Sequence, residues 1–293
     1  MNRLGCVRTG VAMNTLVTVE VLRPGAEDAV DRAFVWFHEI ERCCTRFDPA
    51  SELMRLTART GAPSPASAIL FEAVRIALAV AEASGGAFDP TVGHPMESRG
   101  FNREHRSGEL VCTAIPDDGP VSYRDVQLDP THQTITLLRP LLLDLGAVAK
   151  GLALDAAARE LLPFEDFAID AGGDLYLGGC NSAGAPWSVG IRHPRREHEL
   201  IAWLQVRDQA VCTSGDYERG EHILDPRTGA PAHLVASATV VAPTAVLADA
   251  LATAAFVLGP AHGLELLEQT GVQGMIVTPD LRSYETRGLR HAT

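Results

Sequence analysis

The irregular order of strand-like and helix-like segments is the feature that most restricts how this chain can fold. Residues 16–22 are rich in β-branched side chains and alternate between two faces, which predicts a strand. Helix-like stretches cover about 26–44, 67–84, 146–161, 244–258 and 260–270, a hairpin is expected over 121–139, and short strands with Gly-rich turns fill 166–242. Because strands and helices do not alternate regularly, we expect an α+β fold of mixed sheets with packed helices.

The acidic balance of the chain argues against some partners. Its 293 residues hold 25 Lys and Arg against 37 Asp and Glu, which gives a formal charge of −12. Binding to a phosphate backbone depends on clustered cations that release counterions. We therefore expect no nucleic-acid partner.

We also expect no transmembrane segment and a cytoplasmic location. The most apolar window, residues 239–261, contains Pro243 and Asp249, and its expected helix over 244–258 would be about 22 Å long, short of a ~30 Å bilayer core. No apolar stretch precedes Cys6, as an export signal would require. The six cysteines show no C-x-x-C spacing and are interpreted as reduced thiols.

Several common catalytic patterns are absent from the sequence. No two glycines are separated by one residue, which excludes a G-x-G-x-x-G dinucleotide fingerprint. Lys150 lacks the Walker A spacing, the histidines form no H-E-x-x-H, and Ser214 lies outside any G-x-S-x-G elbow. Rossmann, P-loop, zinc and hydrolase explanations therefore lose most of their weight.

Asp249 and Thr253 lie four residues apart in an expected helix, so their side chains share one face. A carboxylate and a hydroxyl placed in this way supply two oxygen ligands to a hard cation such as Mg²⁺. Taken alone, such a pair more often reflects a surface carboxylate beside a packed threonine. The other residues between Ala248 and Phe256 are all apolar, which favours a desolvated carboxylate that needs a partner or a metal.

A second candidate site spans residues 143–151. Asp144 ends an apolar strand-like run, and Lys150 lies one turn into the following helix. Backbone N–H groups at a helix start, together with a lysine, form an anion site that suits a pyrophosphate. A surface lysine after an Asp N-cap explains the same residues equally well.

Three further segments combine tight turns with polar chemistry. Residues 84–93 contain hinge-like glycines, an aromatic and an acid, a pattern that is also typical of a helix C-cap and turn. Residues 213–219 and 222–229 concentrate titratable groups. His222 has the chemistry of a general base near neutral pH, although a structural histidine is the commoner alternative.

Taken together and in this order, six segments resemble the ApbE family, the FAD:protein FMN transferases. They are Gly86-Ala87-Phe88-Asp89-Pro90-Thr91-Val92-Gly93, Asp144-Leu145-Gly146-Ala147-Val148-Ala149-Lys150-Gly151, Gly172-Gly173-Asp174, Thr213-Ser214-Gly215-Asp216-Tyr217, His222-Ile223-Leu224-Asp225-Pro226-Arg227-Thr228-Gly229 and Ala248-Asp249-Ala250-Leu251-Ala252-Thr253. The resemblance implies the ApbE-like fold, with the nucleotide site in a cleft between two lobes. We accordingly expect an N-terminal tail over 1–12 and a single flavin transferase domain over 13–293.

The resemblance also implies a reaction: Mg²⁺-dependent cleavage of the FAD pyrophosphate and transfer of FMN, through a phosphoester bond, to a Thr or Ser hydroxyl of an acceptor flavoprotein, with release of AMP. It places the metal on the Ala147 carbonyl, Asp249 and Thr253. The flavin-nucleotide contacts that it implies are Met13, Phe47, Ala87, Phe88, Asp89, Asp144, Lys150 and Ile223. For removal of the hydroxyl proton, His222 is the first candidate and Asp216 the second.

The chain departs from the family pattern in three ways. The family's early Met-Gly-Thr is Met13-Asn14-Thr15 here, so Asn14 is expected at a position suited to positive φ. His193 precedes Pro194 where the family often has Asp, and the export signal of many members is not seen. Two rival functions remain open at this point: a Mg²⁺-dependent FAD pyrophosphatase that yields FMN and AMP, and a non-catalytic FAD-binding carrier.

Overall fold

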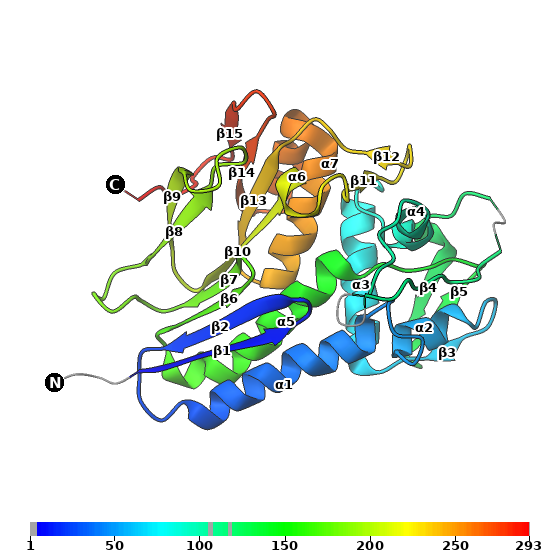
Figure 1. Cartoon of the computed structure of the whole chain (residues 1–293), viewed down its shortest axis with the longest axis horizontal. Helices are drawn as coiled ribbons and strands as arrows, with labels where there is room; N and C mark the ends of the chain where they lie inside the picture. Colours follow the sequence, from blue (N-terminus) through cyan, green and yellow to red (C-terminus); the bar gives the residue numbers. More distant parts are fainter. Residues whose placement is uncertain (1–4, 105–107, 117–118, 293) are drawn as a thin grey trace.

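An eight-stranded sheet forms the centre of the protein in a computed structural model that describes residues 5–104, 108–116 and 119–292 (Figure 1). The strand order is β1-β2-β6-β7-β10-β13-β14-β15, and each neighbouring pair is antiparallel. These strands are β1 (Cys6–Ala12), β2 (Thr15–Val21), β6 (Phe167–Ala171), β7 (Asp174–Gly178), β10 (Gln209–Gly215), β13 (Ser237–Ala242), β14 (Gln273–Val277) and β15 (Ser283–Glu285). The predicted α+β class is confirmed.

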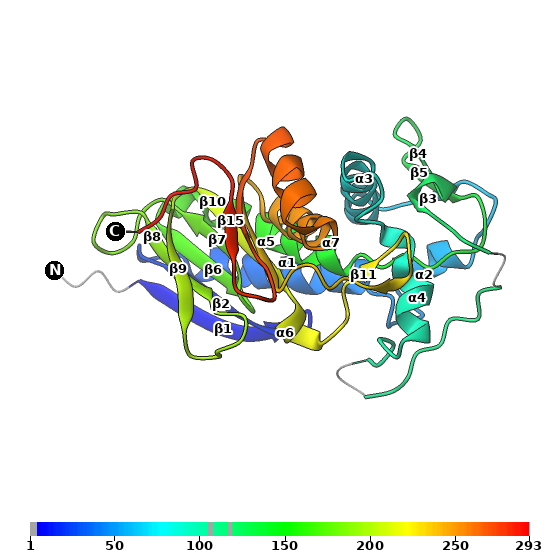
Figure 2. The same cartoon turned by 90° about the horizontal axis from the view of Figure 1, so that it is seen from above.

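Different elements cover the two faces of this sheet (Figure 2). The helices α1 (Glu27–Cys44), α5 (Gly146–Leu161) and α7 (Ala245–Gln269) pack on one another and on one face. The hairpin of β8 (Trp187–Arg192) and β9 (Leu200–Val206) covers part of the other face, where its aliphatic side chains form a second apolar cluster with those of β10, β13 and β14.

Most of the remaining elements lie at the end of the molecule away from the two chain termini, and α6 directly follows β10 (Figure 1). A three-stranded sheet has the order β3-β5-β4. Its strands and the nearby helices are β3 (Ser64–Pro65), β4 (Val126–Asp129), β5 (Thr134–Leu137), α2 (Glu52–Thr57), α3 (Ala68–Ala83) and α4 (Gly93–Ser98). The short elements that follow β10 are α6 (Asp216–Arg219), β11 (Leu224–Asp225) and β12 (Ala230–Pro231).

The alternation in β2 explains why this segment pairs in only one register. Val17, Val19 and Val21 are fully buried on the helix side, whereas Leu16 on the opposite side is 58% exposed. Opposite them on β6, Phe167, Ile169 and Ala171 are equally buried. A shift of β2 by one residue would move its three buried valines to the opposite face of the sheet, so burial fixes the pairing.

Two local predictions were wrong. The expected tail over 1–12 contains strand β1, which pairs with β2 along its whole length; Met1–Leu4 lie outside the described residues. Between the helices expected over 26–44 and 67–84, where no helix was predicted, the structure has helix α2, whose N-cap Ser51 accepts a hydrogen bond from the Met54 amide at 3.1 Å. The serine satisfies an amide of the first turn, which is how such a short helix can begin.

Helix α7 joins the two helices expected over 244–258 and 260–270. Gly259 lies inside it with φ +78° and ψ 177°, and Pro260 follows, so the helix is kinked at the predicted break and continues beyond it. By length and composition alone, this helix could span a membrane. However, 67% of its most apolar window is buried inside the protein, as in the core helix of a globular fold.

The start of α7 is held by a side chain from another helix. The N-cap Thr244 makes no side-chain capping bond. Instead, the Asp155 carboxylate of α5 accepts hydrogen bonds from the Ala245 amide at 2.7 Å and the Val246 amide at 3.0 Å. Burial raises the pKa of Asp155 to about 6, although these two amides act in the opposite direction.

The raised pKa of Asp155 predicts a stability effect of a definite sign. Since the folded state binds this proton more tightly than the unfolded state, the contribution of Asp155 is most favourable below pH 4 and is lost as pH rises through about 6. The free energy of unfolding of the wild type, minus that of Asp155→Asn, should fall by up to about 3 kcal/mol between pH 4 and pH 7. Urea denaturation across this range measures it. Asp166→Asn, at the start of β6, is the control, and a difference that rises with pH would contradict the prediction.

Candidate active site

The carboxyl end of β10 is the point on which the polar side chains of three other elements converge. The Thr213 amide donates to Asp174 Oδ1 of β7 at 3.2 Å. Asp174 is only 3% exposed and forms an ion pair with Lys150 of α5. A buried carboxylate thus holds the lysine beside β10, and the lysine balances the buried charge.

The next residue of β10, Ser214, contacts Thr253, one of the two predicted metal ligands on α7. Ser214 Oγ lies 3.0 Å from Thr253 Oγ1 of α7, within hydrogen-bonding distance. Asp249, one turn earlier in α7, is 7% exposed. The predicted buried carboxylate and the neighbouring hydroxyl are therefore present on one helix, with the hydroxyl against β10.

Cys212, the residue before Thr213 in β10, is buried against the first turn of α7. Its Sγ lies 3.6 Å from the Ala245 carbonyl oxygen, and its side chain is fully buried. Burial raises the pKa of the Cys212 thiol well above its usual range, the Asp249 carboxylate raises it further, and Lys150 opposes both. The sulfur therefore stays a thiol, which is a poor metal ligand compared with a thiolate.

The chemistry of this donor set fits a hard divalent cation. Asp249 offers a carboxylate and Thr253 a hydroxyl, and Ala147 lies in the first turn of α5, one turn before Gly151. Within the described residues, no group of three or more His, Cys, Asp or Glu side chains is placed to bind a metal. Oxygen donors with few carboxylates suit Mg²⁺, which keeps water or substrate oxygens in its remaining positions.

Asp144 and Phe47 are linked by a residue that the sequence interpretation missed. Arg46 is 4% exposed, its Nε donates to Asp144 Oδ2 at 2.7 Å, and its guanidinium carbon lies 4.3 Å from the centre of the Phe47 ring. The other oxygen of Asp144 accepts from the Gly146 amide at 2.8 Å, at the start of α5. An arginine between an aromatic and a distant acid gives no local sequence signal.

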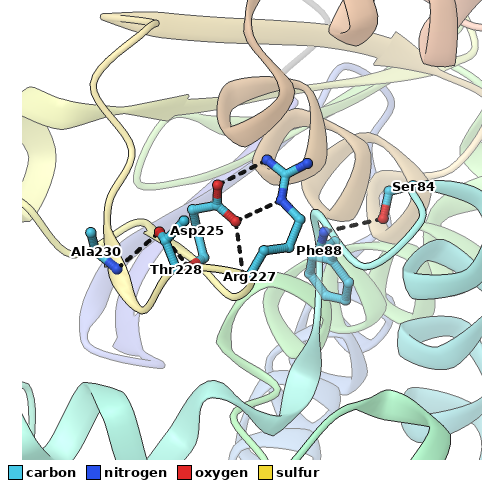
Figure 3. A network of polar contacts seen from close by, with 6 residues as sticks. All are labelled: Ser84, Phe88, Asp225, Arg227, Thr228 and Ala230. Carbon is cyan, nitrogen blue, oxygen red and sulfur yellow. Dashed lines mark hydrogen bonds and ion pairs between the residues drawn. The ribbon is translucent and has the colours of Figure 1, made fainter. Parts of the chain in front are cut away.

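The segment with Ala87, Phe88 and Asp89 is largely structural in this fold. All three residues are buried, and the Phe88 amide donates to Ser84 Oγ at 3.1 Å (Figure 3). Asp89 accepts hydrogen bonds from the Thr91 amide, the Thr91 hydroxyl and the Tyr123 amide at 2.8–2.9 Å. Burial raises the pKa of Asp89 despite these bonds. Contact of this segment with a nucleotide stays a prediction.

A cavity of about 280 Å³ lies beyond the end of β10, and Asp216, Tyr217, Ile223 and Phe256 are among the residues that line it. Both carboxylate oxygens of Asp216 accept hydrogen bonds from Arg195, at 2.6 and 2.7 Å. Burial raises the pKa of Tyr217 to about 12, so its hydroxyl stays protonated at neutral pH.

His222 precedes Ile223 and is half-buried. Its Nδ1 lies 3.0 Å from the Gly220 carbonyl oxygen. Since a carbonyl only accepts, Nδ1 carries the hydrogen of this bond, and the lone pair of the neutral ring is on Nε2. The Asp225 carboxylate, two residues beyond Ile223, is bound by the Arg227 side chain at 2.8 Å (Figure 3).

Two of the three departures from the family pattern, at Asn14 and His193, can be located in the fold. Met13 and Asn14 form the turn between β1 and β2 with φ of 50° and 60°, so the expectation of positive φ at Asn14 is confirmed. His193 is buried, and its Nδ1 accepts a hydrogen bond from the Arg195 amide at 3.1 Å. The histidine therefore shapes the loop that carries Arg195.

Several site residues were not assigned a role from the sequence: Arg46, Asp155, Asp174, Arg195 and Ser214. Asp174 and Ser214 lie within segments that the family resemblance used, and an acid directly after two glycines was an available signal. Each of the five acts through a partner far away in the sequence. Such contacts need the tertiary fold to become visible.

This fold and this site define a class: an α+β protein in which a buried carboxylate, a hydroxyl and an ion-paired lysine from two packed helices lie beside the end of a central strand. The model of the ApbE family matches residues 13–276, and the chain belongs to this family.

Named relatives agree with this assignment. The chain is 33% identical to the FAD:protein FMN transferase of Treponema pallidum, with 96% of this chain and 87% of that protein covered, and 30% identical to that of Escherichia coli K12, with 80% and 72% covered. The crystal structure of the ApbE protein from Thermotoga maritima superimposes with a TM-score of 0.85 at 28% identity, and the flavin transferase ApbE from Vibrio cholerae with 0.84 at 25%. Each alignment covers 97% of both chains.

Because Asp174 is buried, its ion pair with Lys150 should make a measurable contribution to the free energy of unfolding. In a double-mutant cycle of Lys150→Met and Asp174→Asn, the coupling free energy of unfolding should be about 1–3 kcal/mol, because Asp174 is desolvated while Lys150 is 27% exposed. Urea denaturation of the four proteins gives this value. The more exposed Arg32–Glu160 pair is the control and should give less than about 1 kcal/mol. Equal coupling in the two cycles would contradict the prediction.

Proposed function

We propose that this chain transfers FMN from FAD to a Thr or Ser hydroxyl of an acceptor flavoprotein, forms a phosphoester bond and releases AMP in a Mg²⁺-dependent reaction. The observation that carries the proposal is the meeting of three elements at β10: Asp174, paired with Lys150 of α5, accepts the Thr213 amide, and Thr253 of α7 contacts Ser214 one turn after the buried Asp249. The proposal draws equally on the relatives, which are named FAD:protein FMN transferases.

The site supplies positive potential for a pyrophosphate from two sources. Lys150 is oriented by Asp174, and the start of α5 contributes the positive end of its helix dipole. Asp249, Thr253 and the Ala147 carbonyl are the residues that would hold Mg²⁺. When bound, this cation neutralises charge on pyrophosphate oxygens and makes AMP a better leaving group.

The acceptor hydroxyl must lose its proton as it attacks the phosphorus atom, and His222 is the residue proposed to take it. The bond between Nδ1 and Gly220 leaves the basic lone pair on Nε2, and this bond lies at the exposed surface, where a second protein can approach, although the residue as a whole is half-buried. Asp216 is the weaker candidate because Arg195 engages both of its oxygens.

The first test is product analysis by mass spectrometry with FAD, Mg²⁺ and a candidate acceptor flavoprotein. We expect the acceptor to gain the mass of FMN while AMP appears, and Asp249→Ala to reduce both at least a hundredfold, because it removes the carboxylate of the proposed cation site. Glu265→Ala is the matched control: it removes an exposed acid near the other end of the same helix. AMP and FMN without an adduct would favour the pyrophosphatase, and intact bound FAD would favour the carrier.

The second test concerns the proton acceptor. His222→Ala should lower kcat for transfer by about 10²- to 10⁴-fold and leave the KM for FAD within a few-fold, because the proposed role is confined to the attacking hydroxyl. His132→Ala, in the turn between β4 and β5, is the control, since that histidine pairs only locally with Asp129. Unchanged turnover of His222→Ala at saturating FAD would remove this residue from the mechanism.

A further inference from the structure

The proposed metal ligands lie on one face of α5 and one face of α7. These two faces, called stripes below, touch each other at other residues. On α5, Ala147, Gly151 and Asp155 are spaced four residues apart, and on α7 the same spacing joins Ala245, Asp249 and Thr253. Residues at this spacing lie above one another on one helix face. The two helices pack directly on each other.

The first contact between the stripes is a close approach of two backbones at Gly151. A Cβ atom on Gly151 would lie 2.5 Å from Val246 Cα and 2.6 Å from the Ala245 carbonyl oxygen. These are backbone atoms of the first turn of α7 and have no side-chain freedom with which to move aside. Any other residue at 151 would therefore push this turn away from α5.

The second contact is the carboxylate of Asp155, one turn further along α5. It accepts the Ala245 and Val246 amides, two of the amides that a helix start leaves without intrahelical partners. Asp155 is 7% exposed, so these bonds lie inside the protein and are not exchanged readily for bonds to water. Since the side chain of Thr244 makes no capping bond, the cap of α7 comes from α5.

The contacts hold the turn of α7 that immediately precedes the proposed ligands. Asp249 is four residues after Ala245 and three after Val246, so its Cα is fixed by one helical turn from two anchored amides. Cys212 adds a further restraint on this turn from β10, because its Sγ lies 3.6 Å from the Ala245 carbonyl oxygen.

We propose that Asp155 and Gly151 form a clasp that sets the register of α7 against α5 and thereby positions Asp249 and Thr253 for the divalent cation. Neither clasp residue touches the ligand: both act through the first turn of α7. The proposal rests on the proposed function for the identity of the cation site. Residues that orient metal ligands typically change metal affinity by about 10- to 100-fold when they are replaced.

The test measures binding of Mn²⁺, as a spectroscopic substitute for Mg²⁺, to the full chain by electron paramagnetic resonance, with and without FAD. Hydrogen exchange of residues 244–256 is followed in parallel. Asp155→Ala removes both capping bonds, Asp155→Asn keeps one acceptor oxygen, and Gly151→Ala displaces the turn while Asp155 is retained. The matched control is Asp166→Ala. It removes a carboxylate that accepts the Cys180 amide at 2.9 Å and lies directly before β6.

The clasp predicts a graded result. Asp155→Ala and Gly151→Ala should raise the dissociation constant for Mn²⁺ at least tenfold and accelerate exchange in the first turn of α7, with Asp155→Asn intermediate and Asp166→Ala unchanged in both. The graded series keeps the test informative if the alanine variant of Asp155 folds poorly.

Two outcomes would overturn the proposal, and they are distinguishable. If the wild type binds Mn²⁺ and transfers FMN, and the Asp155 and Gly151 variants bind Mn²⁺ within twofold of it, only the clasp is refuted. If the wild type binds no Mn²⁺ in either condition and transfers no FMN, the proposed function is refuted, and the clasp proposal, which depends on it, is refuted as well.

Discussion

The burial of negative charge is the constraint on which the rest of this structure depends. Among the described residues, the buried acids are Asp89, Asp155, Asp174 and Asp249. A desolvated carboxylate destabilises a fold unless it is hydrogen-bonded, paired or bound to a cation, and the chain uses different solutions. Asp89 binds backbone and hydroxyl donors, Asp155 caps a helix, and Asp174 pairs with Lys150. Each solution ties together elements that are distant in sequence, so the acids that make the site also assemble it.

The sequence predicted those parts of the fold whose stabilisation is local. Helices α1, α3 and α5 begin and end within a residue or two of their predicted positions. In α1 and α3 the apolar periodicity follows a single buried face, whereas α5 is buried all round. Strand β1 escaped prediction for a physical reason. Its Val7 and Val11 lie on the open face and are 64% and 69% exposed, whereas Arg8 and Gly10 alternate with them and face the helices. An edge strand with this pattern has no apolar alternation to recognise.

The same reasoning separates the predicted from the unpredicted parts of the site. Asp249 and Thr253 were visible because their spacing is a property of one helix and their neighbours are apolar. Asp174, Ser214 and Arg195 were not assigned a role, because their importance comes from partners 24, 39 and 21 residues away or more. For Asp89, the sequence suggested a nucleotide contact, while the fold engages both of its oxygens in hydrogen bonds to Thr91 and Tyr123.

Helix α5 is the element that connects these observations. It carries Lys150, which pairs with Asp174 at the site, while Gly151 and Asp155 fix the start of α7. A helix of this length is stiff, because each turn is bonded to the next. Lys150, on the side proposed to bind the pyrophosphate, and Asp249, on the side proposed to bind the cation, are therefore both positioned by the same rigid helix. A displacement of α7 along α5 would move Asp249 relative to Lys150 by the same amount, and the close approach at Gly151 leaves little room for such a displacement.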